Sequence, residues 1–209
     1  MNPLYADLPT TIFEKMSALA RETGAINLGQ GFPDAGWPRD VLEAGARART
    51  DGYNQYPPMP GLPALRQAVA DHYRRHQGID LDWQTEITVT SGATEALAAS
   101  IMALVSPGDE VLLIQPMYDA YLPMVRQAGG VPKLIRLEPP EWRLTEAALA
   151  EAFTPRTRVV LLNNPLNPAA VVYPREDLEM LGRICQEFDL IAICDEVWEH
   201  VVFDGRAHI

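Results

Sequence analysis

The feature that most constrains the fold is an alternation of short apolar runs with amphipathic stretches, which begins near residue 86 and continues to residue 194. Short apolar runs predict buried strands, and apolar residues at a spacing of three or four predict helices. We expect strands at 86–90, 111–114, 131–137, 158–162 and 190–194, and helices at 93–105, from after 114 to about 128, at 145–153 and at 174–188. This order predicts an α/β fold with a mainly parallel sheet and helices on both faces.

The first 85 residues follow a different pattern, because proline and glycine are frequent at 29–38 and 56–61. One helix is expected at 63–76, where apolar residues recur at helical spacing. We therefore interpret 1–45 as an N-terminal arm and lead-in, and 46–209 as the sheet domain.

Charge and cysteine content exclude several classes of protein. The net charge is −11, which argues against nucleic acid and anionic membrane as partners. Cys185 and Cys194 do not form a C-x-x-C pair, and Cys194 lies in an apolar run, where we expect it to be buried. No apolar run approaches the roughly 20 residues of a membrane span, and no secretory signal is recognisable. The expected compartment is the cytoplasm.

Ligands of open α/β sheets bind beyond the carboxyl ends of the strands, so the residues that follow each strand are the candidates for function. Small residues at 91–96 open a helix, which is typical either of a phosphate cradle or of an ordinary capped helix. Tyr118 could lie flat on a planar ring or belong to the core. Two Asn-Pro steps at 164–168 predict a rigid turn, which could aim an amide side chain. Asp195 ends an apolar run, either solvated or paired with a positive group.

Other readings of these segments fail simple checks. The chain has two lysines, Lys15 and Lys133, and neither lies in a phosphate-binding G-x-x-x-x-G-K-[S/T] loop. A dinucleotide fingerprint at 29–31 lacks its third glycine and is followed by proline. His72 and His76 are four residues apart but lack the glutamate of H-E-x-x-H, and His200 has no paired nucleophile. We expect no metal site.

Taken in order, these segments resemble the fold-type-I aminotransferases of class I and II, and most of all the kynurenine, glutamine and methionine aminotransferase group. The resemblance covers nearly the whole chain. It rests on the segments 26–34, 54–56, 60–62, 90–97, 108–111, 118–119, 163–168, 195–197 and 200–205.

The resemblance implies pyridoxal 5'-phosphate as the cofactor and assigns a role to each candidate residue. Ala93 and Thr94 would hold the phosphate, with Gly92 allowing close approach. Tyr118 would stack on the pyridine ring, and Asn167 would bind its phenolic oxygen. The resemblance also implies that Asp195 would pair with the protonated ring nitrogen, that Tyr56 would reach the phosphate of a neighbouring subunit, and that Gly31 would line the substrate pocket.

The implied reaction is transfer of an amino group from a methionine-like, aromatic or glutamine-like amino acid to a 2-oxo acid, in a homodimer that acts in amino acid metabolism. Two alternatives stay open at this stage. One is a carbon–sulfur lyase on the same scaffold, and the other is a non-catalytic remnant.

Three departures from the family pattern bear on that reaction. Ala169 and Ala170 stand where relatives usually have a glycine, and Trp198 stands at a position usually held by tyrosine, although an indole can only donate a hydrogen bond. The resemblance places the Schiff-base lysine and the substrate-binding arginine further along than Ile209. We therefore expect a large domain truncated at its C-terminal side, with no catalytic residue in this chain and no activity by itself.

Overall fold

A computed structural model of the chain describes residues 2–6, 8–31 and 35–209. The chain forms two compact units, one of residues 8–89 and one of residues 90–209 together with the described residues before 7. Each unit has its own packing. The predicted domain boundary at residue 45 stays a prediction.

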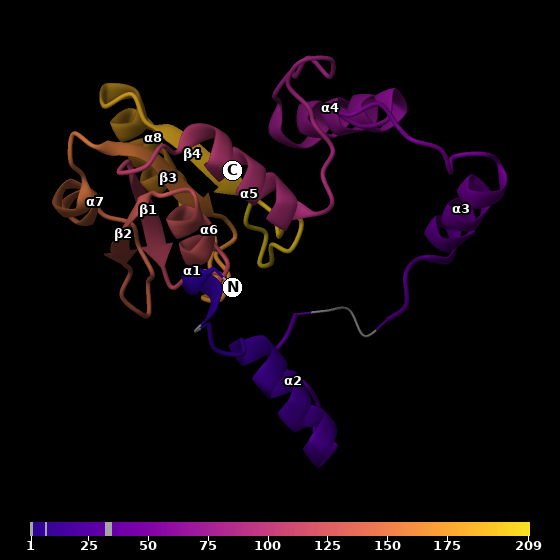
Figure 1. Ribbon diagram of the computed structural model, residues 1–209, viewed down its shortest axis with the longest axis horizontal. Coiled ribbons are helices and arrows are strands. Elements are labelled where there is room, and N and C mark those ends of the chain that lie inside the picture. The colour runs from indigo at the N-terminus through magenta and orange to yellow at the C-terminus, as the bar shows by residue number, and fades with distance from the viewer. Residues whose placement is uncertain (1, 7, 32–34) are drawn as a thin grey trace. The chain divides into compact units, whose positions relative to one another are not determined.

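The unit of residues 90–209 is built on a parallel sheet in the order β2-β1-β3-β4 (Figure 1). The strands are β1 (Glu110–Gln115), β2 (Val131–Arg136), β3 (Thr157–Asn163) and β4 (Ile191–Asp195). The helices are α5 (Ala93–Leu104), α6 (Tyr121–Gln127), α7 (Glu146–Ala152), α8 (Arg175–Glu187) and the short α1 (Pro3–Ala6), which packs on α6. The predicted α/β class and parallel sheet are confirmed.

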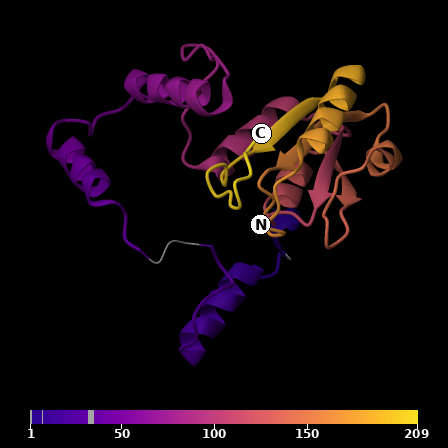
Figure 2. The same cartoon turned by 180° about the vertical axis from the view of Figure 1, so that it is seen from behind.

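Successive residues of the central strands point to opposite faces of the sheet, and each face has its own core. Val111 and Leu113 of β1 pack with residues of α5 and α6 on one face (Figure 1). Leu112 and Ile114 pack with residues of α7 and α8 on the other (Figure 2). Burial on both sides explains why these strands are continuous apolar runs, since each buried aliphatic side chain stabilises the fold by about 1.5–3 kcal/mol.

Two helix starts follow the sequence prediction closely. The hydroxyl of Thr145 accepts a hydrogen bond from the backbone N–H of Ala148 at 3.2 Å, which makes it the N-cap of α7. Pro174 occupies the N-cap position of α8. The segment before α7 is tied to α8 through the buried Asp177, which accepts hydrogen bonds from Arg143 at 2.5 Å and from the backbone N–H of Leu144 at 3.1 Å.

The unit of residues 8–89 contains α2 (Ile12–Thr23), α3 (Arg39–Thr50) and α4 (Pro63–Gln77). The helix expected at 63–76 is confirmed as α4. Its buried Arg66 donates to the carbonyl oxygens of Ile87 at 2.8 Å and Gln84 at 2.9 Å, and its guanidinium lies over the Trp83 ring. Throughout the described part of the chain, no helix is long and apolar enough to cross a bilayer.

Two expectations are wrong. Residues 86–90 form no strand, because Arg66 takes the carbonyl of Ile87 and the N–H of Val89 donates to the carbonyl of Pro60 at 2.8 Å. Cys194 is exposed and not buried, because it lies on β4, an edge strand whose side chains are only partly covered. Helices α2 and α3 were not predicted, and the structure buries no apolar side chain of either helix.

The close approach of Gly61 to Val89 gives a test of packing in the unit of residues 8–89. A Cβ at Gly61 would lie 2.6 Å from Cγ2 of Val89, and the backbone φ is +107°. We expect Gly61→Ala to lower the free energy of unfolding by about 3 kcal/mol. Gly78 also has a positive φ, +69°, but a Cβ there would meet nothing within 4 Å, so Gly78→Ala should cost only about 1 kcal/mol. Equal losses in urea unfolding followed by circular dichroism would contradict this account.

A buried carboxylate gives a test at the amino end of the sheet. Glu110 is fully buried, and its oxygens accept hydrogen bonds from the hydroxyl of Thr154 at 2.6 Å and from Arg156 at 2.7 Å. The Thr154 hydrogen bond, aided by Arg156 and Lys133, holds the pKa of Glu110 below its ordinary value despite burial, which acts to raise it. The resulting stability is present above about pH 4.5 and is lost as pH falls through the lowered pKa.

We therefore expect Thr154→Val to lower the free energy of unfolding at pH 7 by about 1–2 kcal/mol and to make acid unfolding begin at a higher pH. The control is Arg175→Ala, which removes an exposed ion pair to Glu179 at 3.7 Å and should change little. An acid-unfolding midpoint that does not move in Thr154→Val would refute the role of this hydroxyl.

Candidate functional site

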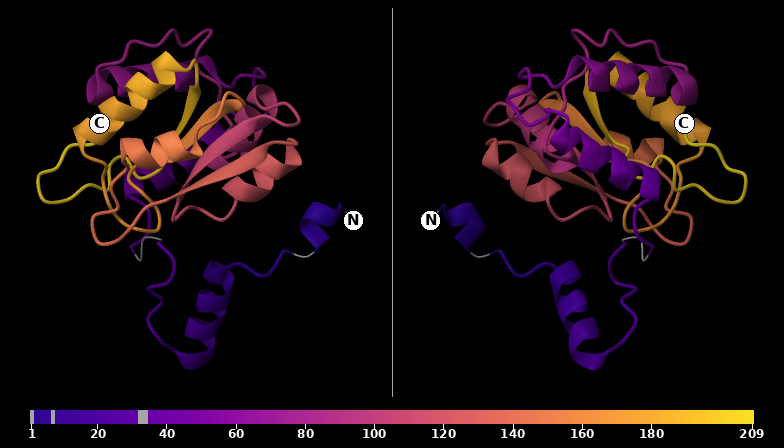
Figure 3. Two further views of the ribbon diagram at one scale, coloured as in Figure 1. Left: turned by 90° about the vertical axis from the view of Figure 1, so that its left-hand side faces the viewer. Right: turned by 90° about the vertical axis from the view of Figure 1, so that its right-hand side faces the viewer.

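The candidate site lies where β1, β3 and β4 end side by side. β3 ends at Asn163 and β4 at Asp195, and these two residues are register partners in the parallel ladder. After β4 the chain runs to residue 209 without a helix or strand (Figure 3). Polar groups from three sequence segments therefore meet at the carboxyl edge of the sheet, where open α/β sheets bind their ligands.

Asp195 is held at both carboxylate oxygens. The hydroxyl of Tyr121 donates to its Oδ2 at 2.5 Å, and the backbone N–H of Val197 donates to its Oδ1 at 3.3 Å. Tyr121 is almost fully buried, and burial together with the bond to Asp195 raises the pKa of the phenol. The phenol therefore stays protonated and remains a donor throughout the physiological range.

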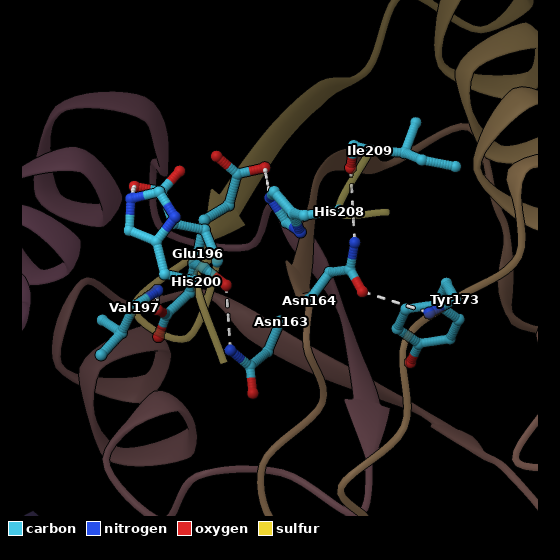
Figure 4. A network of polar contacts seen from close by, with 10 residues as sticks. Asn163, Asn164, Tyr173, Glu196, Val197, His200, His208 and Ile209 are labelled. Carbon is cyan, nitrogen blue, oxygen red and sulfur yellow. Dashed lines mark hydrogen bonds and ion pairs between the residues drawn. The ribbon is translucent and has the colours of Figure 1, made fainter. Parts of the chain in front are cut away.

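The Asn-Pro turn is tied to the same strand end (Figure 4). The side-chain amide of Asn163 donates to the backbone carbonyl of Asp195 at 2.9 Å, and its oxygen accepts from the backbone N–H of Asn167 at 2.7 Å. The backbone N–H of Asn164 donates to the same carbonyl at 3.1 Å, while its side-chain oxygen accepts from the N–H of Tyr173. Asn163 and Asn164 are both buried, so each satisfied amide fixes the turn.

Tyr118 follows β1 and packs edge-to-face against Tyr121, with ring centroids 5.7 Å apart and an interplanar angle of 75°. Tyr118 is half-buried, and one of its faces is not occupied by Tyr121. The predicted stacking residue and the predicted nitrogen partner are thus linked through Tyr121.

The start of α5 has the features of an anion site. Gly92 is the N-cap residue with φ +81°, provides no side-chain hydrogen bond to the first turn, and has nothing within 4 Å of where a Cβ would lie. Gly92, Ala93 and Thr94 are exposed. The Glu95 carboxylate accepts from the backbone N–H of Ser91, and α5 packs against β4. Uncapped N–H groups and the helix dipole favour an anion at this position.

A cavity of about 490 Å³ adjoins the turn. Asn167 and Trp198, both predicted site residues, line it together with Val201 and Phe203. Its lining is therefore mainly apolar, with the amide of Asn167 as one of its polar groups. The structure thus brings Tyr118, Asn167, Asp195 and Trp198 into one region of the unit of residues 90–209.

The other predicted site residues belong to the unit of residues 8–89. Gly31 is exposed, and the side chain of Tyr56 is fully exposed. Residues 32–34 of the motif at 26–34 lie outside the described residues. Of the two lysines, Lys133 lies 3.9 Å from Glu110, at the opposite end of the sheet from Asp195. The roles assigned to individual site residues stay predictions.

One group of possible metal ligands lies near the site. Ligand atoms of Glu196, Glu199 and His208 fall within 4.8 Å of one another. Glu196 Oε1 lies 3.3 Å from His208 Nε2 (Figure 4), and this close carboxylate–imidazole contact accounts for the arrangement. We assign no metal to it.

Sequence reasoning missed the supporting residues Tyr121, Asn163 and Asn164. Tyr121 lies three residues after Tyr118, and Asn163 and Asn164 close a strand next to the first Asn-Pro step. These sequence positions, next to predicted site residues, indicate that the three side chains lie near the site. Their partners depend on contacts between segments far apart in sequence, such as the 74 residues between Tyr121 and Asp195.

Comparison with known proteins agrees with this geometry. The family model for aminotransferase class I and II matches residues 23–208. The chain is 48% identical to a probable N-succinyldiaminopimelate aminotransferase of Mycobacterium tuberculosis and 45% identical to a methionine aminotransferase of Escherichia coli. Each of these matches covers 96% of the present chain. The crystal structure of an Escherichia coli methionine aminotransferase superposes with a TM-score of 0.95 at 44% identity, over the whole chain and 55% of that structure.

The chain therefore belongs to the class I and II aminotransferases of fold type I, a family of pyridoxal phosphate enzymes. It spans about half the length of the curated relatives it matches, covering 51% of the Mycobacterium tuberculosis protein. The predicted family and cofactor are confirmed.

The residues present fit this cofactor. Gly92 leaves open space before an uncapped helix start, which suits a phosphate. Asp195 is a half-exposed carboxylate that accepts hydrogen bonds from Tyr121 and Val197. Because a carboxylate can accept about four hydrogen bonds, it has acceptor positions left for a ligand. Each group has the charge and exposure that its predicted partner on the cofactor requires.

The buried amide of Asn163 offers a test of the site's framework. We expect Asn163→Ala to lower the free energy of unfolding by about 2–3 kcal/mol, because it leaves the N–H of Asn167 without its acceptor and the carbonyl of Asp195 without one of its donors. The control is Asn54→Ala, which removes an exposed bond to the carbonyl of Arg49 and should cost less than about 1 kcal/mol. Similar urea midpoints for the two variants would show that the turn does not depend on Asn163.

Proposed function

We propose that the protein transfers an amino group from an amino acid to a 2-oxo acid with pyridoxal 5'-phosphate. The observation that carries this proposal is the Asp195 carboxylate, fixed at the carboxyl edge of the sheet by Tyr121 and beside the turn that holds Asn167. When bound, the cofactor supplies an electron sink for the carbon that carries the amino group. The role of the protein would be to keep the ring nitrogen of the cofactor protonated and therefore cationic.

Each residue of the site has a defined task in this proposal. The N–H groups of Ala93 and Thr94 bind the phosphate, with Gly92 leaving room for it. Tyr118 supplies an aromatic face for the ring. The amide of Asn167 donates to the phenolic oxygen. Asp195 would accept a hydrogen bond from the protonated ring nitrogen and keep that proton in place through charge pairing.

Trp198 is the main departure from this family scheme. It shares the cavity with Asn167, and its indole N–H can donate but its ring has no acceptor oxygen. We propose that it takes the family's tyrosine position as a second donor with a larger apolar body.

The substrates and assembly follow from the relatives as proposals. Methionine-like, aromatic and glutamine-like amino acids are the proposed donors, and the mainly apolar lining near Trp198 and Phe203 favours the first two. Gly31 is proposed to line the substrate pocket. The fully exposed side chain of Tyr56 is available to reach the phosphate of a second copy, so we propose a homodimer. The cytoplasm and a role in amino acid metabolism stay predictions.

The proposal concerns the whole protein, because the relatives are about twice as long as this chain. The relatives named above are aminotransferases, so they give no support to the carbon–sulfur lyase or to the non-catalytic remnant considered from the sequence.

The direct test uses the protein purified from its native source, reduced with borohydride and weighed intact. We expect a cofactor adduct on reduction, and formation of the matching 2-oxo acid when methionine or phenylalanine is incubated with 2-oxoglutarate. Replacement of Asp195 by asparagine should lower kcat at least about a hundredfold, because the ring nitrogen loses its anionic partner.

Arg175→Ala provides the control, since its exposed ion pair lies on α8, and it should leave the rate unchanged. A protein that binds pyridoxal phosphate yet converts no amino acid with any 2-oxo acid would overturn the proposed function.

A further inference from the structure

We propose that Tyr121 is a positioning residue, whose hydroxyl holds the Asp195 carboxylate in the one orientation that serves the cofactor. The inference rests on the role proposed for Asp195, and it assigns to Tyr121 a task that acts only through that carboxylate. Its basis is the 2.5 Å hydrogen bond from the Tyr121 hydroxyl to Asp195 Oδ2.

Asp195 needs such a partner because, among the described residues, one other hydrogen bond holds its carboxylate. It is the last residue of an edge strand and is half-exposed. The contact from the N–H of Val197 to Oδ1 is longer, at 3.3 Å, and comes from the irregular segment that follows the strand. A carboxylate with one long bond can rotate about its side-chain torsions, whereas a second, short bond to the other oxygen sets its plane.

Tyr121 can set that plane because its own ring cannot move. Its side chain is 2% exposed and packs in the core between the sheet and α5, in a cluster that includes Leu113 and Val125. The first turn of α6 supplies its backbone. Packing of the ring therefore fixes the position of the hydroxyl, and the hydrogen bond from this hydroxyl fixes the Asp195 carboxylate.

The chemistry of a phenol also suits the task. Burial and the neighbouring Asp195 carboxylate raise the pKa of Tyr121, so the hydroxyl donates at every pH at which the protein works. A neutral donor orients the carboxylate without neutralising it, whereas a cationic donor would compete with the ring nitrogen for the same charge.

A second tyrosine of the same unit provides a matched control. Tyr173 is also 2% exposed, and its hydroxyl has no hydrogen-bond partner among the described residues. Replacement of either tyrosine by phenylalanine removes one hydroxyl from a buried ring of the same shape. Of the two hydroxyls, that of Tyr121 bonds Asp195 and that of Tyr173 has no partner in the described part of the chain, so the loss of the Tyr121 hydroxyl should alter a property that depends on that carboxylate.

The test measures binding of pyridoxamine 5'-phosphate, which needs no lysine for attachment, to the whole protein and its variants by isothermal titration calorimetry. We expect Tyr121→Phe to weaken binding roughly tenfold and Tyr173→Phe to leave it unchanged. In the Asp195→Asn background, Tyr121→Phe should add less than about a twofold loss, because its effect passes through Asp195. Circular dichroism before each titration checks that every variant is folded.

The outcomes separate the inference from the proposed function. If the wild-type whole protein does not bind the probe, or if Asp195→Asn binds as well as wild type, the role of Asp195 fails and that of Tyr121 falls with it. If Asp195→Asn weakens binding while Tyr121→Phe does not, or if the two losses add independently, only the positioning role is overturned.

A readout without cofactor tests the hydrogen bond itself. Urea unfolding should show a lower midpoint for Tyr121→Phe than for Tyr173→Phe, because only the first variant loses a hydrogen bond to a charged group. Equal midpoints for the two variants would contradict the bond on which the inference rests.

Discussion

The pairing of β3 with β4 is the constraint on which the rest of the site depends. Asn163 and Asp195 end their strands as register partners, so the amide of one lies within reach of the carbonyl of the other. The Asn-Pro turn is held to that carbonyl by two hydrogen bonds, one from the side-chain amide of Asn163 and one from the backbone N–H of Asn164. Because side chains alternate along a strand, a slip of one residue would turn Asp195 to the opposite face and away from Tyr121. The geometry of the candidate site is thus a consequence of strand register.

Much of the framework could be predicted from the sequence, because it depends on local patterns. The apolar runs of β1 and β3 identify strands buried on both faces, and Thr145 and Pro174 mark helix starts by side-chain and backbone chemistry that needs no distant partner. The position of Asp195 at a strand end was likewise readable, because the carboxylate follows directly on an apolar run.

What the sequence could not supply are the partners that make those residues a site. The bond from Tyr121 to Asp195 joins residues 74 positions apart, and nothing local distinguishes Tyr121 from Tyr173, which is equally buried but has no hydrogen bond at its hydroxyl among the described residues. The wrong strand at 86–90 has the same origin, since its backbone groups are taken by Arg66 and Pro60 from another segment. Local propensity yields to tertiary contacts at these positions.

The outer edge of β4 has a consequence for how the described sheet can grow. Ile191, Ala192 and Cys194 are exposed there, and no strand of the described residues pairs with that edge. Its backbone donors and acceptors form a template to which another extended segment can add. The described sheet can therefore be extended at this edge by a further strand, and the ladder groups of β4 would set the register of that strand.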